Sequence, residues 1–137
     1  MTARMAGVAE PDDEVIALAT RLFDMARAGR TEELLAYVDA GVSPNLANHK
    51  GDTLVMLAAY HGHGETVRAL LARGAEADRP NDRGQTPLAG AVFKDEEAVI
   101  RALLDGGADP AQGSPSALAT ARMFERDDLV ALLQGSE

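Results

Sequence analysis

Apolar positions recur along the chain with the spacing of short amphipathic helices, and these helices come in pairs. In the first helix of a pair, apolar residues stand four positions apart, as Leu22 and Ala26 do. In the second helix of a pair, an apolar residue is followed by further apolar residues three and four positions later. At a step of 33 residues, the aligned sets are Leu22, Val55 and Leu88; Ala26, Ala59 and Val92; Leu34, Val67 and Ile100; Tyr37, Leu70 and Leu103; Val38, Leu71 and Leu104. A period of this length predicts units that bury their apolar faces against copies of themselves.

The same step reappears in the residues that begin and end each helix pair. Residues 62–76 read GHGETVRALLARGAE, and residues 95–109 read DEEAVIRALLDGGAD. Thr53 and Thr86 each directly precede the first helix of a pair, at the position of the N-cap, where threonine is one of the preferred residues. The glycines that close the units, Gly41, Gly74 and Gly107, suit a left-handed position after a helix. Turn residues stand at Asn48-His-Lys-Gly51 and Asn81-Asp-Arg-Gly84, so each unit is predicted to run turn, helix, turn, helix.

The two ends of the chain carry modified copies of the unit. The C-terminal copy aligns at a step of 30, with Ser116, Leu118, Ala121, Leu129, Val130 and Leu133 matching Thr86, Leu88, Ala91, Val99, Ile100 and Leu103. The first helix is expected to begin near Pro11. We expect one domain over residues 10–135, with a cap repeat at about 12–47, repeats at 48–80 and 81–113, and a C-terminal cap at 114–135. Residues 1–9 show no periodicity and are predicted to be disordered.

Composition agrees with one all-α domain and narrows the class of partner. The chain has 137 residues, of which 46% are hydrophobic and only 4% aromatic, so the core must be built from Ala, Leu and Val. The net charge of -9 argues against a nucleic-acid partner, because phosphate binding needs clustered Lys and Arg. There is no cysteine, and hence no disulfide or thiolate metal site. No uncharged stretch approaches the length of a membrane span, and we expect a cytoplasmic protein without a membrane partner.

Two segments resemble the ankyrin repeat, GDTLVMLAAYHGHGETVRALLARGAEAD and RGQTPLAGAVFKDEEAVIRALLDGGADP. That family's signature combines G-x-T-P-L, small residues, G-H, an apolar V-x-x-LL and a closing G-A-D. The resemblance implies an all-α solenoid of stacked helix-turn-helix units with projecting turns or short hairpins. The chain departs from the signature at Leu54, which replaces proline, and at Met56 and Ala89, which replace histidine. Asp95 and Glu96 replace G-H, so the first helix of that repeat needs another way to end.

Residues with catalytic or metal-binding chemistry do not form a convincing set. His61 and His63 stand close in sequence, but a zinc site needs three or four ligands, and only His49 could add to them. The resemblance gives His63 a structural role instead. No phosphate-binding glycine motif or G-x-S-x-G elbow is present, and paired carboxylates such as Glu96 and Glu97 fall where second helices begin. We therefore expect neither an enzyme nor a metal or cofactor site.

The resemblance implies partner contacts from the turn tips and from exposed positions of each first helix, on a concave face. Carried onto this chain, the predicted partner-binding residues are His49, Lys50, Asp52, Tyr60 and His61 in one repeat, and Asp82, Arg83, Gln85, Phe93 and Lys94 in the next, with Arg27, Ala28, Met123 and Phe124 extending the row. Tyr60 and Phe93 share one frame position and are either exposed anchors or packing residues. The basic and titratable residues of the row favour an acidic or mixed partner.

Two functions stay open at this stage. The first is a monomeric protein-protein interaction module: an adaptor, a regulator or a chaperone-like partner of another protein. The alternative is a structural protein that self-assembles through the exposed ends of the stack. Polar residues in the caps, such as Arg21 where the internal repeat has Leu54, favour the first.

Overall fold

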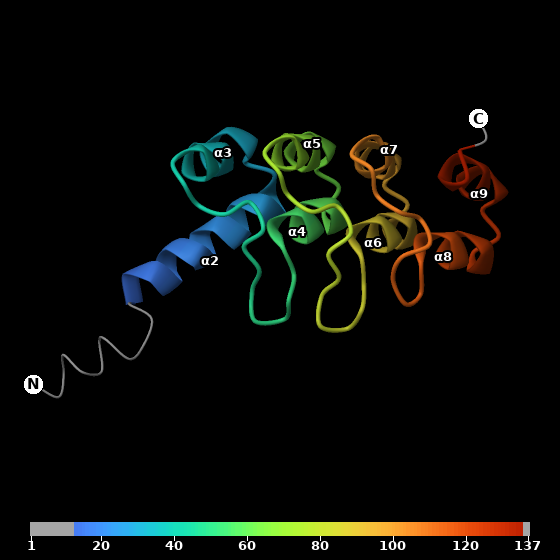
Figure 1. The fold of residues 1–137 in the computed structure, drawn as a ribbon, viewed down its shortest axis with the longest axis horizontal. Coiled ribbons are helices and arrows are strands. Elements are labelled where there is room, and N and C mark those ends of the chain that lie inside the picture. Colours follow the sequence, from blue (N-terminus) through green and yellow to red (C-terminus); the bar gives the residue numbers. More distant parts are fainter. Residues whose placement is uncertain (1–12, 136–137) are drawn as a thin grey trace, which may run out of the picture.

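The computed structural model describes residues 13–135, which form four helix pairs. The pairs stand in a row (Figure 1). The first helices of the pairs form one layer, and the second helices lie beside them in another layer (Figure 1). The first-layer helices are α2 (Asp13–Ala28), α4 (Leu54–Tyr60), α6 (Pro87–Lys94) and α8 (Ala117–Met123). The second-layer helices are α3 (Thr31–Asp39), α5 (Gly64–Ala72), α7 (Glu97–Asp105) and α9 (Asp127–Leu133). The predicted all-α solenoid is confirmed.

The projecting connectors are turns. Within residues 13–135 the chain forms no strand, and pairing of the strand type is limited to isolated bridges such as Ala47 with Thr53 and Gly113 with Ser116. The connectors are therefore the projecting turns that the fold predicts, some of them closed by single antiparallel bridges.

Side-chain caps start three of the first-layer helices. The hydroxyl oxygens of Thr53, Thr86 and Ser116 each accept a hydrogen bond from the backbone N–H three residues later, at 3.1, 3.2 and 3.1 Å. Each cap satisfies a backbone donor that the first turn of a helix leaves unpaired. The capping roles predicted for the two threonines are confirmed, and Ser116 repeats them in the C-terminal cap.

The ends of the helices follow the predicted glycine frame, except after α6 and α8, where Asp95 and Glu125 take the left-handed conformation instead of a glycine. Gly74 and Gly107 have φ of +94° and +92°, which confirms the left-handed positions expected after the second helices. After α6, where the repeat lacks its glycine, Asp95 itself takes the left-handed conformation with φ 58° and ψ 46°. Asp is one of the few residues with a side chain that enters this region readily. Its carboxylate is 2.8 Å from Arg126 of the next repeat, so an ion pair accompanies the strained backbone.

The core lies between the two layers and runs through the whole stack. Along the first layer, α4 packs between α2 and α6, and α6 between α4 and α8. Leu70 and Leu103 of the second layer are completely buried, as the repeat frame predicts. Leu71 and Leu104, one position further, are only half-buried. In α5 and α7 the buried stripe is therefore narrower than the apolar pattern indicates.

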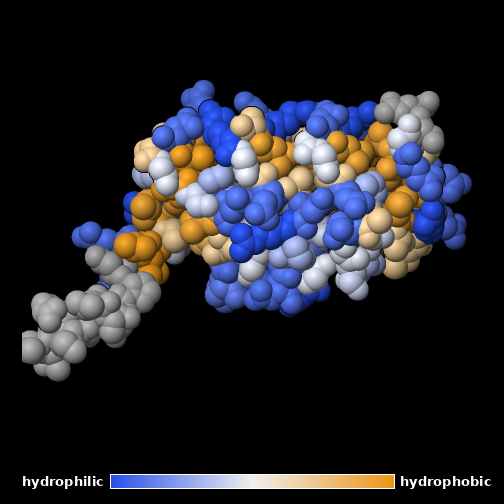
Figure 2. Space-filling model, in the orientation of Figure 1, coloured by the Kyte–Doolittle hydropathy of each residue, from blue (hydrophilic) through white to orange (hydrophobic). Residues whose placement is uncertain are grey.

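The beginning of α2 extends past the packed part of the stack. Val15 and Ile16 are exposed, although they continue the helical apolar pattern that leads to the buried Leu22. Figure 2 shows hydrophobic residues gathered at this end of the molecule, at the left. Arg21 is exposed, as expected for a cap residue. The predicted helix start at Pro11 and the predicted disorder of residues 1–9 lie outside the described residues.

Candidate functional site

The turn tips of successive repeats are joined by hydrogen bonds, which fix them in a row. The Asp82 N–H donates to the Lys50 carbonyl at 3.0 Å, and the Asn81 side-chain amide donates to the Asp52 carboxylate at 2.9 Å. Within each turn, the asparagine side chain also accepts bonds from the backbone, as Asn48 does from the Lys50 N–H at 2.9 Å. Side chains on the tips are thus presented from a connected backbone and not from separate loops.

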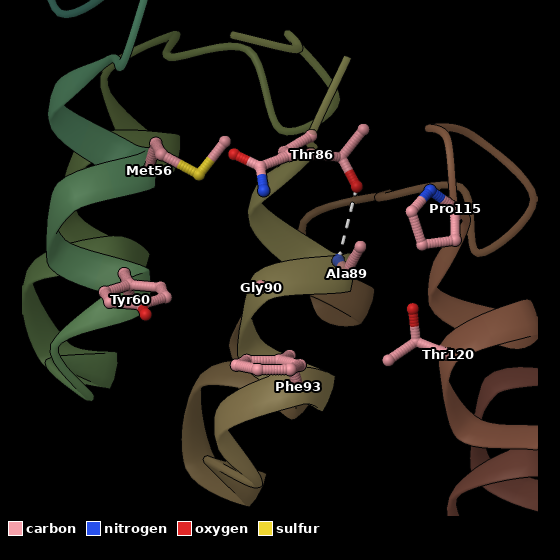
Figure 3. A pocket seen from close by; sticks show the side chains of 9 residues that line it. Met56, Tyr60, Thr86, Ala89, Gly90, Phe93, Pro115 and Thr120 are labelled. Atoms are coloured by element: carbon pink, nitrogen blue, oxygen red, sulfur yellow. Dashed lines mark hydrogen bonds between the residues drawn. The ribbon is translucent and has the colours of Figure 1, made fainter. Parts of the chain in front are cut away.

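A pocket of about 170 Å³ opens between α4, α6 and the start of α8. In Figure 3, Met56 and Tyr60 of α4 stand on one side, and Pro115 and Thr120 stand on the other. Gly90 lies between them on α6, one turn before Phe93 (Figure 3). The complete lining is Met56, Tyr60, Gln85, Thr86, Ala89, Gly90, Phe93, Pro115 and Thr120.

A second and wider pocket of about 360 Å³ lies between two turn tips and α4. Its lining is His49, Lys50, Asp52, Met56, Leu57, Tyr60, Asn81, Asp82, Arg83 and Gln85. Met56, Tyr60 and Gln85 line both pockets, so the two pockets adjoin each other. We call the two adjoining pockets, with their two sets of lining residues, the turn-side groove.

Aromatic side chains mark the edge of the groove and are exposed. Tyr60 and Phe93 have 42% and 58% of their surface accessible, so the interpretation of either ring as buried packing is wrong. Each ring still contacts another ring. The Tyr60 ring meets the His61 ring edge-on at 5.6 Å, and the Phe93 ring lies 5.8 Å from the ring of the exposed Phe124. The aromatic row thus continues into the C-terminal cap.

The cations in the groove and beside it have no carboxylate partners among the described residues. Lys50, Arg83 and Lys94 form no ion pair there. Six arginines elsewhere do, as in the contact of Arg73 with Asp39 at 2.8 Å, which links neighbouring second-layer helices. The arginines with carboxylate partners are Arg27, Arg30, Arg68, Arg73, Arg101 and Arg126. Positive charge without a carboxylate partner is therefore present at the groove, and Arg21, Arg79 and Arg122 are the other described arginines that form no ion pair.

The histidines near the end of α4 have different surroundings. Partial burial lowers the pKa of His61, and the neighbouring His63, Arg27 and Lys94 lower it further. His63 is hydrogen-bonded through Nε2 to the Arg27 carbonyl at 2.8 Å, which gives it the structural contact that the resemblance implies. Among residues 13–135, no three His, Cys, Asp or Glu side chains are grouped so that they could hold a metal ion.

The structure brings most of the predicted binding residues together. Eight of the ten line one or both pockets: His49, Lys50, Asp52, Tyr60, Asp82, Arg83, Gln85 and Phe93. The other two, His61 and Lys94, lie against the Tyr60 ring. Sequence reasoning missed the lining residues Met56, Leu57, Asn81, Thr86, Ala89, Gly90, Pro115 and Thr120. Most of these belong to caps, turns or helix packing, and a periodic pattern does not show that they also border a cavity.

Comparison with known proteins agrees with this architecture. A family model described as ankyrin repeats, in three copies, matches residues 22–113. The chain belongs to the ankyrin repeat family, whose repeats are in general protein-protein interaction modules. An ankyrin repeat protein of Pseudomonas aeruginosa, PA3287, is 51% identical over 59 residues, which are 43% of this chain and 34% of that protein. The chain thus matches about a third of the length of this curated relative.

The fold is also found among solved structures. The ankyrin repeat domain of human ASB11 superimposes with a TM-score of 0.73 at 25% sequence identity, over 85% of this chain and 53% of that one. None of the helices in residues 13–135 has the length and apolar character needed to cross a membrane.

Proposed function

We propose that the chain binds another protein through the turn-side groove, as an adaptor, a regulator or a chaperone-like partner. The observation that carries the proposal is the combination, on one continuous surface, of exposed aromatic rings with cations that no carboxylate of the described residues neutralises. Exposed aromatic residues are frequent anchors of protein interfaces. The groove residues Tyr60, Arg83 and Phe93 lie outside the buried core, so they are free to recognise a partner without holding the stack.

The further parts of this proposal are a monomeric state and a cytoplasmic location. The alternative function, self-assembly through the ends of the stack, draws support from the exposed Val15 and Ile16 of α2. Sedimentation over a range of concentrations separates the two. A single species at all concentrations agrees with the interaction module, and an association abolished by Val15→Ser/Ile16→Ser supports the alternative.

Site-specific photocrosslinking tests the proposal directly. A photoreactive phenylalanine analogue placed at Phe93 reports on the groove, and the same analogue at the exposed Ala72 of α5 is the control on the second layer. We expect a defined crosslinked product with a different protein from position 93 and not from position 72. Equal products from both positions, or products from position 72 alone, would contradict the groove as the binding site. A crosslink from position 93 to a second copy of the chain would favour self-assembly.

A further inference from the structure

Gly90 occupies a position where a glycine weakens the fold. It is the fourth residue of the eight-residue helix α6, and glycine is less favourable than alanine in a helix interior because it loses more backbone freedom on folding. The other repeats do not have glycine at this position. The corresponding residue is Leu57 one repeat earlier and Thr120 in the C-terminal cap. Two side chains of ordinary size are thus accepted at the same frame position.

Nothing in the packing of the described residues requires glycine at this position. Gly90 is helical and is absent from the residues with positive φ. A Cβ atom built on it would meet Cδ1 of Tyr60 at 3.7 Å, which is an ordinary van der Waals contact. A side chain is therefore permitted by backbone conformation and by space. What glycine provides is the open volume of the first pocket, which a longer side chain would occupy.

The pocket has the size and lining of a site for a single apolar side chain. Its volume of about 170 Å³ is below the roughly 300–1,000 Å³ of small-molecule sites. Tyr60, Phe93 and Pro115 give it apolar walls, and Met56 adds an adaptable surface. A large apolar residue of a partner, placed over Gly90, would contact these side chains and be removed from water.

Charge around the pocket indicates what accompanies that apolar residue. Lys50 and Lys94 are the only lysines in the chain, and both lie at the groove in a protein whose net charge is -9. Arg83 adds a third cation without a carboxylate partner in the described residues. The lining also contains two carboxylates, Asp52 and Asp82. Asp52 accepts a hydrogen bond from the side-chain amide of Asn81. The lining thus balances two cations with two carboxylates, and Lys94 over the Tyr60 ring adds one positive charge beside it. The groove is therefore less negative than the rest of this protein, whose net charge is -9, and it is the more favourable surface for an acidic partner.

We propose that the groove recognises an acidic segment of a partner protein, and that one large apolar side chain of the segment occupies the pocket over Gly90. The carboxylates on either side of that residue then meet Lys94, Arg83 and Lys50. This inference rests on the proposed function, and it adds the chemistry of the partner and the residue that selects for it. Gly90 acts as a specificity-determining residue because the absence of its side chain creates the pocket.

Selection from a library of random displayed peptides tests the inference without a known partner. Peptides are selected on the full chain and then screened against Gly90→Leu, which restores the side chain found at Leu57. Ala72→Leu is the matched control, since it adds a leucine on the exposed face of α5. We expect peptides with net negative charge and one large apolar residue. Gly90→Leu should weaken their binding at least about tenfold, or roughly 1.4 kcal/mol, and the control should not.

Further variants separate the apolar requirement from the charge requirement. Gly90→Ala fills less of the pocket and is expected to weaken binding less than Gly90→Leu, while its helix becomes more stable, so a loss of binding cannot be assigned to unfolding. Lys94→Glu should weaken binding about tenfold or more, and the same reversal at Arg101 on α7 should have little effect. The affinity should also fall as the salt concentration rises.

The possible results distinguish this inference from the broader proposal. Peptides that depend on Gly90 but are neutral or basic would overturn the acidic assignment and leave the groove as a protein-binding site. Binding that is equal in the wild type and Gly90→Leu, or a selection that yields no peptide, would overturn the pocket assignment. In either of these cases, the crosslinks from position 93 decide independently whether the groove binds a protein.

Discussion

The ammonium group of Lys94 lies 4.8 Å from the centroid of the Tyr60 ring. These residues are at the ends of α6 and α4, so the contact joins the first helices of two neighbouring repeats. A cation over an aromatic face is attracted by the negative electrostatic potential of that face, and it keeps its own charge. The contact therefore orients Lys94 beside the groove and leaves its positive charge in place. A carboxylate partner would have neutralised that charge.

Truncation of a core leucine tests the stack. Leu103 is completely buried, and we expect Leu103→Ala to lower the free energy of unfolding by about 2–5 kcal/mol, because the substitution removes buried apolar surface and leaves a cavity. The measurement is equilibrium unfolding in urea. A loss below about 1 kcal/mol would place the residue outside the core and contradict the repeat frame.

Substitution of Asp95 tests the left-handed backbone conformation that ends α6. Asp95 has a positive φ, and this left-handed conformation costs a residue with a Cβ roughly 1–2 kcal/mol. Asp95→Ala and Asp95→Gly both remove the ion pair with Arg126, so the difference between them reports on the backbone alone. We expect the glycine variant to be more stable than the alanine variant by about 1 kcal/mol in urea unfolding. Equal stability would show that the left-handed conformation is not maintained in solution.

The helices and their caps could be predicted from the sequence because they depend on local, repeated signals. The end of α6 could be predicted only in part: the missing G-H at Asp95 and Glu96 indicated a departure, but not that Asp95 would take the glycine conformation. The contact of Lys94 with Tyr60 depends on how neighbouring repeats are spaced, which is a property of packing and not of the periodic pattern. Such contacts require coordinates.

The first pocket illustrates another limit of sequence reasoning. A hydrophobic pattern records the apolar residues that are present, whereas Gly90 acts through a side chain that is absent. Comparison with Leu57 at the same frame position was the signal that could have found it. Pro115 and Thr120 come from the C-terminal cap, whose connector is shortened, so the sequence did not show that they face the groove.

The pH dependence of stability tests the surroundings of His61. Burial and the nearby positive groups lower its pKa in the folded protein from the ordinary 6.5, so the folded state disfavours the protonated form. Between the two pKa values the unfolded chain binds more protons, and stability therefore falls as the pH is lowered through 6.5 and levels off below the depressed pKa. Above 6.5 this contribution is constant.

The comparison that isolates this effect is His61→Gln, which cannot be protonated. Urea unfolding of both proteins over the range from neutral to mildly acidic pH should show a larger loss of stability in the wild type than in the variant. An identical decline in both would mean that other groups cause it. A wild type that gains stability relative to the variant would contradict the lowered pKa.

The central claim is that the groove residues bind a partner while a separate set of residues holds the stack, and Tyr60 and Phe93 test it most directly. The measurement is titration of the crosslinked partner, once purified, beside urea unfolding for Tyr60→Ala and Phe93→Ala, with Arg101→Ala on α7 as the control. We expect each aromatic substitution to weaken binding by about 1–4 kcal/mol, the range of interface anchors, and to change the free energy of unfolding by less than about 1 kcal/mol, since both rings are exposed. Unchanged affinity together with lost stability would show that the rings belong to the core, and the assignment of the groove would have to be abandoned.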